Sequence, residues 1–115
     1  MRRFLISFTA IFFTSFSHAA DVYFCQGKTF TEVKDNNVKE YIPENFKFYA
    51  TRTTLQFGSG GYFNNASMPI SDHISHEYWY AQDKYSTAFF DAPKFHYATI
   101  ELDGAKMITA TCDKF

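Results

Sequence analysis

The sequence predicts an all-β fold, a small antiparallel meander barrel or sandwich of about seven or eight strands. Three observations predict it. Short runs that alternate apolar and polar residues recur after residue 20, separated by Asp, Asn, Gly and Pro, a pattern typical of strands and turns. The part after residue 19 holds 10 of the 15 Phe, all 8 Tyr and the single Trp, enough apolar surface to offset the ordering entropy of a small domain. An Asp-Gly pair near the end indicates a hairpin.

The expected strands follow one another with short breaks. The segment Gln26-Gly27 separates the first two runs, Asp35-Asn36-Asn37 forms a loop, and residues 37–41 are the one place where a helical turn is expected. Gly58-Ser59-Gly60-Gly61 is a flexible loop, and Gln82-Asp83-Lys84 a tight turn. The alternating runs are 22–25, 28–33, 46–50, 53–57, 62–70, 77–81, 85–90, 95–102 and 105–112.

The last two runs give the clearest local signal. Asp103-Gly104 joins them, and this dipeptide favours a type I′ turn, in which both central residues have positive φ. Phe95, Tyr97, Thr99 and Glu101 then share one face of their strand, and the other strand alternates through Lys106, Ile108, Ala110 and Cys112.

The first 19 residues have the features of an export signal. Arg2-Arg3 precede an apolar stretch at 4–16, and Ser17 and Ala19 place small residues before a cleavage point. The apolar stretch is shorter than the about 20 residues that a transmembrane helix needs. We therefore expect a signal peptide at 1–19, a single exported domain at 20–115 located in the periplasm or outside the cell, and no transmembrane segment after cleavage.

The chain has two cysteines, Cys25 and Cys112, one near each end of the expected domain. An exported chain with an even and minimal cysteine count favours a disulfide over a metal site or a catalytic thiol. The bridge would join the first strand to the last, as the closure of a meander requires.

Charge and motifs limit the possible functions. Without Arg2 and Arg3, 9 Lys and Arg stand against 12 Asp and Glu, a net charge of −3, which disfavours nucleic acid as a partner. The sequence shows no nucleophile motif, phosphate loop or dinucleotide fingerprint. We therefore expect neither an enzyme nor a cofactor, and instead a module that binds a protein or a small molecule.

The candidate binding residues are exposed aromatic and loop residues in two segments. The glycine-rich loop leaves the backbone free to adapt to a partner, and Tyr and Trp are the residue types that dominate interface energetics. One expected surface therefore combines residues 59–63 and 78–84. Its members are Ser59, Tyr62, Tyr78, Trp79, Tyr80 and Lys84. The alternative for Trp79 is a place in the core.

Two histidines leave a metal-binding or hydrolytic domain open as an alternative. His73 and His76 lie three residues apart between Asp72 and Glu77, and imidazoles with carboxylates suit Zn²⁺ or Cu²⁺. The order of these residues differs from that of the zinc peptidases. A solvated loop is the more common reason for such a pair, and metal retention after dialysis separates the two readings.

Part of the sequence resembles the periplasmic and membrane-bound inhibitors of C-type lysozyme. Tyr23-Phe24-Cys25 with Gly27-Lys28, together with Cys112, is similar to the cysteine frame of that family. The resemblance implies a small exported β-barrel whose Ser and Lys enter the lysozyme cleft. Ser59-Gly60-Gly61-Tyr62 and Lys84 match those motifs in part, because the family's Arg is missing and Tyr85 replaces its Gly.

Overall fold

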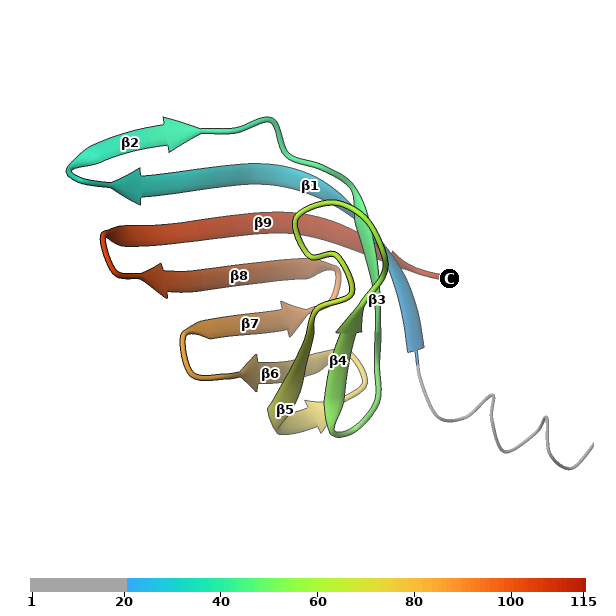
Figure 1. The fold of residues 1–115 in the computed structure, drawn as a ribbon. Coiled ribbons are helices and arrows are strands. Elements are labelled where there is room, and N and C mark those ends of the chain that lie inside the picture. The colour runs from blue at the N-terminus through green and yellow to red at the C-terminus, as the bar shows by residue number, and fades with distance from the viewer. Residues whose placement is uncertain (1–20) are drawn as a thin grey trace, which may run out of the picture.

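The computed structural model describes residues 21–115, so the expected export signal at 1–19 lies outside the described residues. None of the described segments forms a helix of the length and apolarity that a membrane crossing requires. Residues 21–115 fold into nine strands (Figure 1). They are β1 (Asp21–Lys34), β2 (Asn37–Glu40), β3 (Phe46–Ala50), β4 (Thr54–Phe57), β5 (Ser67–Ser75), β6 (Tyr78–Gln82), β7 (Ser86–Asp91), β8 (Lys94–Glu101) and β9 (Gly104–Lys114).

Eight of the strands close an antiparallel barrel. The hydrogen-bonded order runs from β1 through β3 to β9, and β9 pairs again with β1. Residues 21–25 of β1 pair with β3, whereas residues 31–34 pair with β2, which is therefore an extra strand beside the barrel. The all-β antiparallel meander that the sequence predicts is confirmed, with one strand more than expected, and of the two expected forms it is the barrel and not the sandwich.

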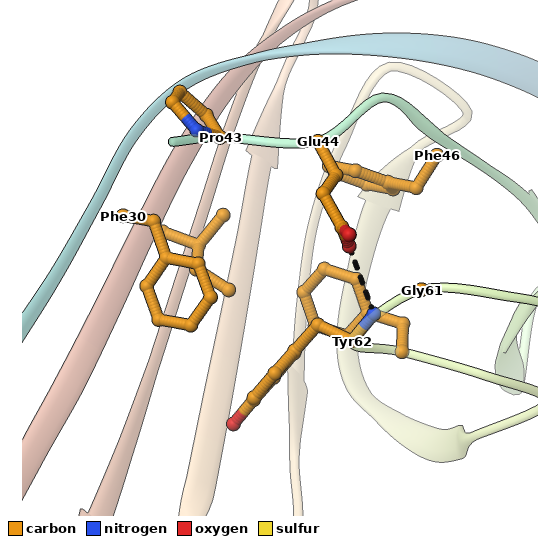
Figure 2. A pocket seen from close by; sticks show the side chains of 8 residues that line it. Phe30, Pro43, Glu44, Phe46, Gly61 and Tyr62 are labelled. Carbon is orange, nitrogen blue, oxygen red and sulfur yellow. Dashed lines mark hydrogen bonds between the residues drawn. The ribbon is translucent and has the colours of Figure 1, made fainter. Parts of the chain in front are cut away.

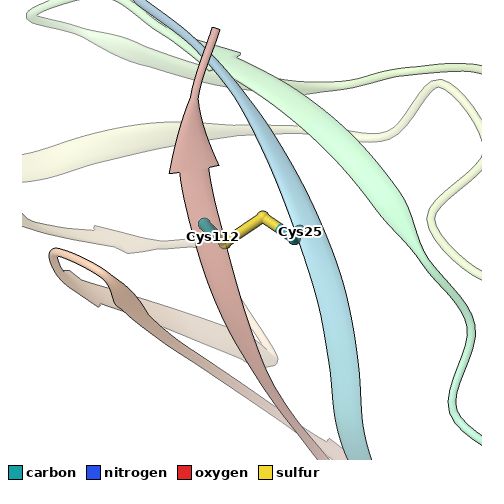
Figure 3. Close-up of a disulfide and its surroundings, with 2 residues drawn as sticks. All are labelled: Cys25 and Cys112. Carbon is teal, nitrogen blue, oxygen red and sulfur yellow. A yellow bond between two sulfur atoms is a disulfide. The ribbon is translucent and has the colours of Figure 1, made fainter.

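The disulfide between Cys25 and Cys112 joins the first strand to the last (Figure 3). The two residues lie directly opposite each other in the β1–β9 pairing, and both are buried. The predicted bridge is therefore confirmed, and it crosses the seam at which the barrel closes.

Inward-facing aromatic side chains fill the barrel. Phe48 of β3 contacts the rings of Trp79, Phe90 and Phe95 from three other strands. Such offset and edge-to-face packing stabilises the core beyond simple area burial. The large side chains that are buried almost completely are Trp79, Phe48, Phe57, Phe90, Phe95 and Leu55.

Three expected elements take another form. Residues 22–25 and 28–33 belong to one strand, β1, whose register shifts between Gly27 and Thr29. Residues 37–40 form β2 in place of a helical turn, because Asp35 and Asn36 adopt φ of 50° and 68° and turn the chain back on β1. The strand expected from residue 62 begins at Ser67, because φ values of 88°, 71° and 59° at Gly60, Gly61 and Asn65 keep the preceding loop curled.

The hairpin between β8 and β9 is confirmed, but its expected turn is wrong. The turn residues are Leu102 and Asp103, and Gly104 already pairs with Glu101. Gly104 does not have positive φ. A Cβ at this position would collide with the backbone of Val33, so glycine is required by the close approach of β9 to β1.

The barrel wall is uneven in height. β1 and β9 have 14 and 11 residues, whereas β3 and β4 have only 5 and 4. Figure 1 shows β1, β9 and β8 running on past the short strands. We call this extension the open half-sheet; it comprises Ser86 and residues 29–34, 37–40, 97–101 and 104–108. Its inner face continues the barrel interior, and its outer face continues the barrel wall.

Candidate functional site

The inner face of the open half-sheet carries charged and aromatic side chains. Alternation places Tyr97, Thr99 and Glu101 there from β8, and Lys106 from β9, on the faces that hold Phe95 and Cys112 deeper in the barrel. The register shift after Gly27 changes which residues of β1 point inward, so that Phe30 packs on the core cluster. Apolar residues thus give way to polar ones toward the open end.

Lys106 is the centre of a charged network. Its Nζ lies 2.9 Å from Glu101 Oε2 and 3.8 Å from Glu32 Oε2. The side chains of Lys106 and Glu32 are only 21% and 12% exposed, so the pair is partly desolvated. The Tyr41 hydroxyl donates a hydrogen bond of 2.7 Å to Glu32 Oε1. The hydrogen bond with Glu101 raises the pKa of Lys106, so Lys106 stays charged across the physiological range.

Tyr62 comes from the loop between β4 and β5 and lies over this face. Its ring contacts Phe30 and Tyr97, with centroid separations of 5.3 and 6.1 Å, and Lys106 Nζ lies 5.7 Å from the ring centroid. Its backbone nitrogen donates to Glu44 Oε1 at 3.2 Å, as Figure 2 shows. The loop is thereby fixed to the chain segment that precedes β3.

A small cavity lies behind Tyr62, between the loop and the barrel interior (Figure 2). Its volume is about 20 Å³, enough for about one water molecule. A ligand of this site would therefore lie on the inner face and against the Tyr62 ring. The residues that line the cavity include Phe30, Pro43, Phe46, Gly61, Phe63 and Ile108.

A chain of hydroxyl groups continues the inner face toward β7. The Tyr97 hydroxyl donates to Ser86 Oγ at 3.1 Å, and Ser86 Oγ donates to Thr99 Oγ1 at 2.8 Å. Thr99 Oγ1 donates to the carbonyl oxygen of Tyr85 at 3.4 Å. Each hydroxyl is held by its neighbour, so the groups are fixed before any ligand arrives.

Tyr62 provides a spectroscopic marker for the site. Burial raises the pKa of Tyr62 from 10.0 to about 12, and Tyr97 adds to the increase. A phenol whose pKa is raised by folding contributes stability that is complete below pH 10 and lost as the pH rises toward about 12. We expect the absorbance titration of the wild type minus that of Tyr62→Phe to show a phenol that ionises near pH 12. A difference curve that is complete near pH 10 would contradict this placement of Tyr62.

The structure separates the residues that the sequence placed on one surface. Tyr62 faces the inner side, and Ser59 is exposed in the same loop. Tyr78 and Tyr80 lie on the outer wall, where both contact Phe89 of β7, with centroid separations of 5.7 and 4.6 Å. Lys84 lies in the β6–β7 turn over the Tyr85 ring. The structure therefore does not bring these residues together on one surface, and of the six only Tyr62 belongs to the inner face.

Trp79 is the clearest correction among the candidate binding residues. Its side chain is 0% exposed and packs against Phe48 and Phe90. It alternates with Tyr78 and Tyr80, which point outward, so the pleat of β6 directs it into the core. A fully buried indole is a core residue and cannot contact a partner at the surface.

His73 and His76 do lie close together, with ring centroids 5.8 Å apart. His76 Nδ1 is 3.3 Å from Asp21 Oδ2, and Lys114 Nζ is 3.3 Å from the other carboxylate oxygen. The Asp21 carboxylate is thus shared between the His76 imidazole and the Lys114 ammonium group. In residues 21–115, no group of three His, Cys, Asp or Glu side chains has an arrangement that could hold a metal ion.

Comparisons with protein-family models, curated proteins and solved structures find no match for this chain.

Sequence reasoning missed the charged and aromatic residues of the inner face apart from Tyr62. Tyr97, Glu101 and Lys106 come from the final hairpin, whereas Glu32 and Tyr41 come from β1 and the residue after β2. The signal that could have found them is the alternation of side chains along the two hairpin strands. Lys106 lies on the same face of its strand as Cys112, and Glu101 lies on the same face of its strand as Phe95.

Proposed function

We propose that the protein is a non-catalytic binding module that acts in the periplasm or outside the cell. The Cys25–Cys112 disulfide supports this location, because such bonds persist in oxidising compartments. The predicted export signal at 1–19 agrees with it. We further propose that the module binds a protein through the inner face of the open half-sheet.

One observation carries this proposal: within residues 21–115, the inner face presents partly exposed tyrosine rings beside an ordered charged network. Tyr62 is 39% exposed, and Tyr41 is 37% exposed. Tyrosine rings held by neighbours lose little conformational entropy on binding. Charged groups beside them supply specificity. The excess of acidic residues over basic ones after residue 19 favours a basic partner.

The proposal is tested by partner capture with matched variants. The oxidised protein is immobilised and exposed to the periplasmic and secreted fractions of the producing cells. We expect Tyr62→Ala and Lys106→Ala each to reduce capture of the specific partner at least about tenfold. Tyr80→Ala is the matched control, because Tyr80 is also 39% exposed but lies on the outer wall. Capture that is lost with Tyr80→Ala and kept with Tyr62→Ala would refute the inner-face site.

A second candidate is inhibition of a C-type lysozyme. Its support is the bridge between the first and last strands of a closed barrel, the frame that the sequence resemblance implies, together with the exposed Ser59. Hen egg-white lysozyme is the probe. Slower lysis of bacterial cells with the wild type, reversed by Ser59→Ala, would favour this candidate. Unchanged lysis in a stoichiometric excess of the protein would remove it.

A further inference from the structure

A row of apolar side chains crosses the outer face of the open half-sheet. In the strand register, Val38 of β2 lies beside Val33 of β1, which lies beside Ala105 of β9, which lies beside Ile100 of β8. The backbone nitrogen of Ile100 donates to the carbonyl oxygen of Tyr85, so the row continues to the start of β7. It runs perpendicular to the strands, on the side of the sheet opposite the candidate site.

These side chains are solvent-exposed. With Leu102 and Met107 beside it, the row forms what we call the outer apolar patch; its large members are Val33, Val38, Tyr85, Ile100, Leu102 and Met107, whose exposed fractions range from 44% to complete exposure. All six are large apolar side chains that lie along or beside the row in the strand register. A contiguous exposed apolar patch of this kind marks an interaction surface on a folded protein.

The two ends of the row carry opposite charges. Glu40 lies on β2 at one end, on the same face as Val38 and hydrogen-bonded to Thr31. Lys84 lies in the turn before β7 at the other end, over the Tyr85 ring. Its neighbour Asp83 faces the chain, where its carboxylate accepts hydrogen bonds from the backbone nitrogens of Tyr85 and Ser86. The small Ala105 is in the middle, between Val33 and Ile100. A second row running in the reverse direction would therefore match this one in charge.

We infer that the outer apolar patch is the interface of a homodimer. A two-fold axis along the strands near Ala105 would reverse the row, so that the Glu40 end of one copy covers the Lys84 end of the other. The same patch then serves both subunits, as a two-fold interface requires. The dimer leaves the inner face free, so it is independent of the proposed protein-binding function and would present two such sites.

Analytical ultracentrifugation of the oxidised protein tests this inference, at about 100 µM, where a micromolar complex is populated. We expect a species of twice the monomer mass, and we expect Ile100→Glu to weaken dimerisation at least about tenfold. Ile74→Glu is the matched control, since Ile74 of β5 is also exposed but lies outside the patch. Circular dichroism checks that both variants stay folded. A wild type that remains monomeric, or a dimer that Ile100→Glu does not weaken, would overturn the inference.

Charge reversal tests the relative orientation of the two subunits. Glu40→Lys and Lys84→Glu should each weaken the dimer, because like charges then meet at both ends of the interface, and the combined variant should restore it. Losses of dimer affinity that add up in the combined variant would overturn the reversed arrangement.

The alternative occupant of the outer apolar patch is a membrane surface, which is tested with vesicles of phosphatidylcholine and phosphatidylglycerol. Monomers that bind these vesicles through Ile100 would overturn the homodimer and assign the patch to a lipid surface.

Discussion

Reduction of the Cys25–Cys112 bridge is expected to lower the free energy of unfolding by about 4–5 kcal/mol. The bonded residues are 87 positions apart, so the bridge restricts almost the whole domain in the unfolded state. The stability of small domains is about 5–15 kcal/mol, so the loss removes a large share of it. The same bridge fixes the seam between β1 and β9. If these two strands separated, the barrel would become an open sheet with two long exposed edges.

The measurement is thermal unfolding followed by circular dichroism, with and without a reducing agent. We expect the Tm to fall by about 20 °C or more on reduction. The control is a variant with both Cys25→Ser and Cys112→Ser, which should melt early and should not respond to the reducing agent. Equal melting of the oxidised and reduced wild type would contradict a stabilising role for the bridge.

Replacement of Trp79 by alanine is expected to destabilise the domain by about 3–5 kcal/mol. The indole is 0% exposed and packs against Phe48 and Phe90, so its removal leaves a large void at the centre of the barrel. Urea unfolding should give a much lower midpoint for Trp79→Ala than for the wild type.

Two further variants test whether the loss of stability comes from the ring that is missing in the core. In residues 21–115, the indole nitrogen of Trp79 is buried and has no hydrogen-bond partner. Trp79→Phe should lose clearly less stability than Trp79→Ala, because a ring remains and an unpaired buried N–H group, which costs about 1–3 kcal/mol, is removed. Tyr80→Ala, on the exposed face of the same strand, should change stability little. Similar losses for Trp79→Ala and Tyr80→Ala would show that Trp79 is not the core anchor.

Most of the architecture could be predicted from local sequence signals. The alternation of residues 95–101 and 105–112 sets the final hairpin, and the two cysteines connect the first strand to the last. The turn types were harder to predict, because the glycine of an Asp-Gly pair can be present either for a positive φ or for its missing Cβ. At Gly104 the missing Cβ allows the close approach to Val33, and this contact joins residues far apart in the sequence.

The candidate site depends even more on long-range contacts. Aromatic composition identifies Tyr62 and Trp79 as residues of interest, but it cannot tell an inward side chain from an outward one until the register is known. The register shift after Gly27 changes which residues of β1 point inward, and it depends on pairing with β9, 80 or so positions later in the chain. The contact of Lys106 with Glu32 therefore follows from the fold and not from any local motif.

The most direct test of the proposed function is site-specific photo-crosslinking in the producing cells. A photoreactive phenylalanine derivative replaces Tyr62 in one strain and Tyr80 in another; these positions are equally exposed, at 39%, but lie on opposite faces of the sheet wall. We predict a discrete heavier adduct from position 62, lost when Lys106→Ala is added, and no such adduct from position 80. An adduct from position 80 alone, or one from position 62 that persists with Lys106→Ala, would contradict binding at the inner face.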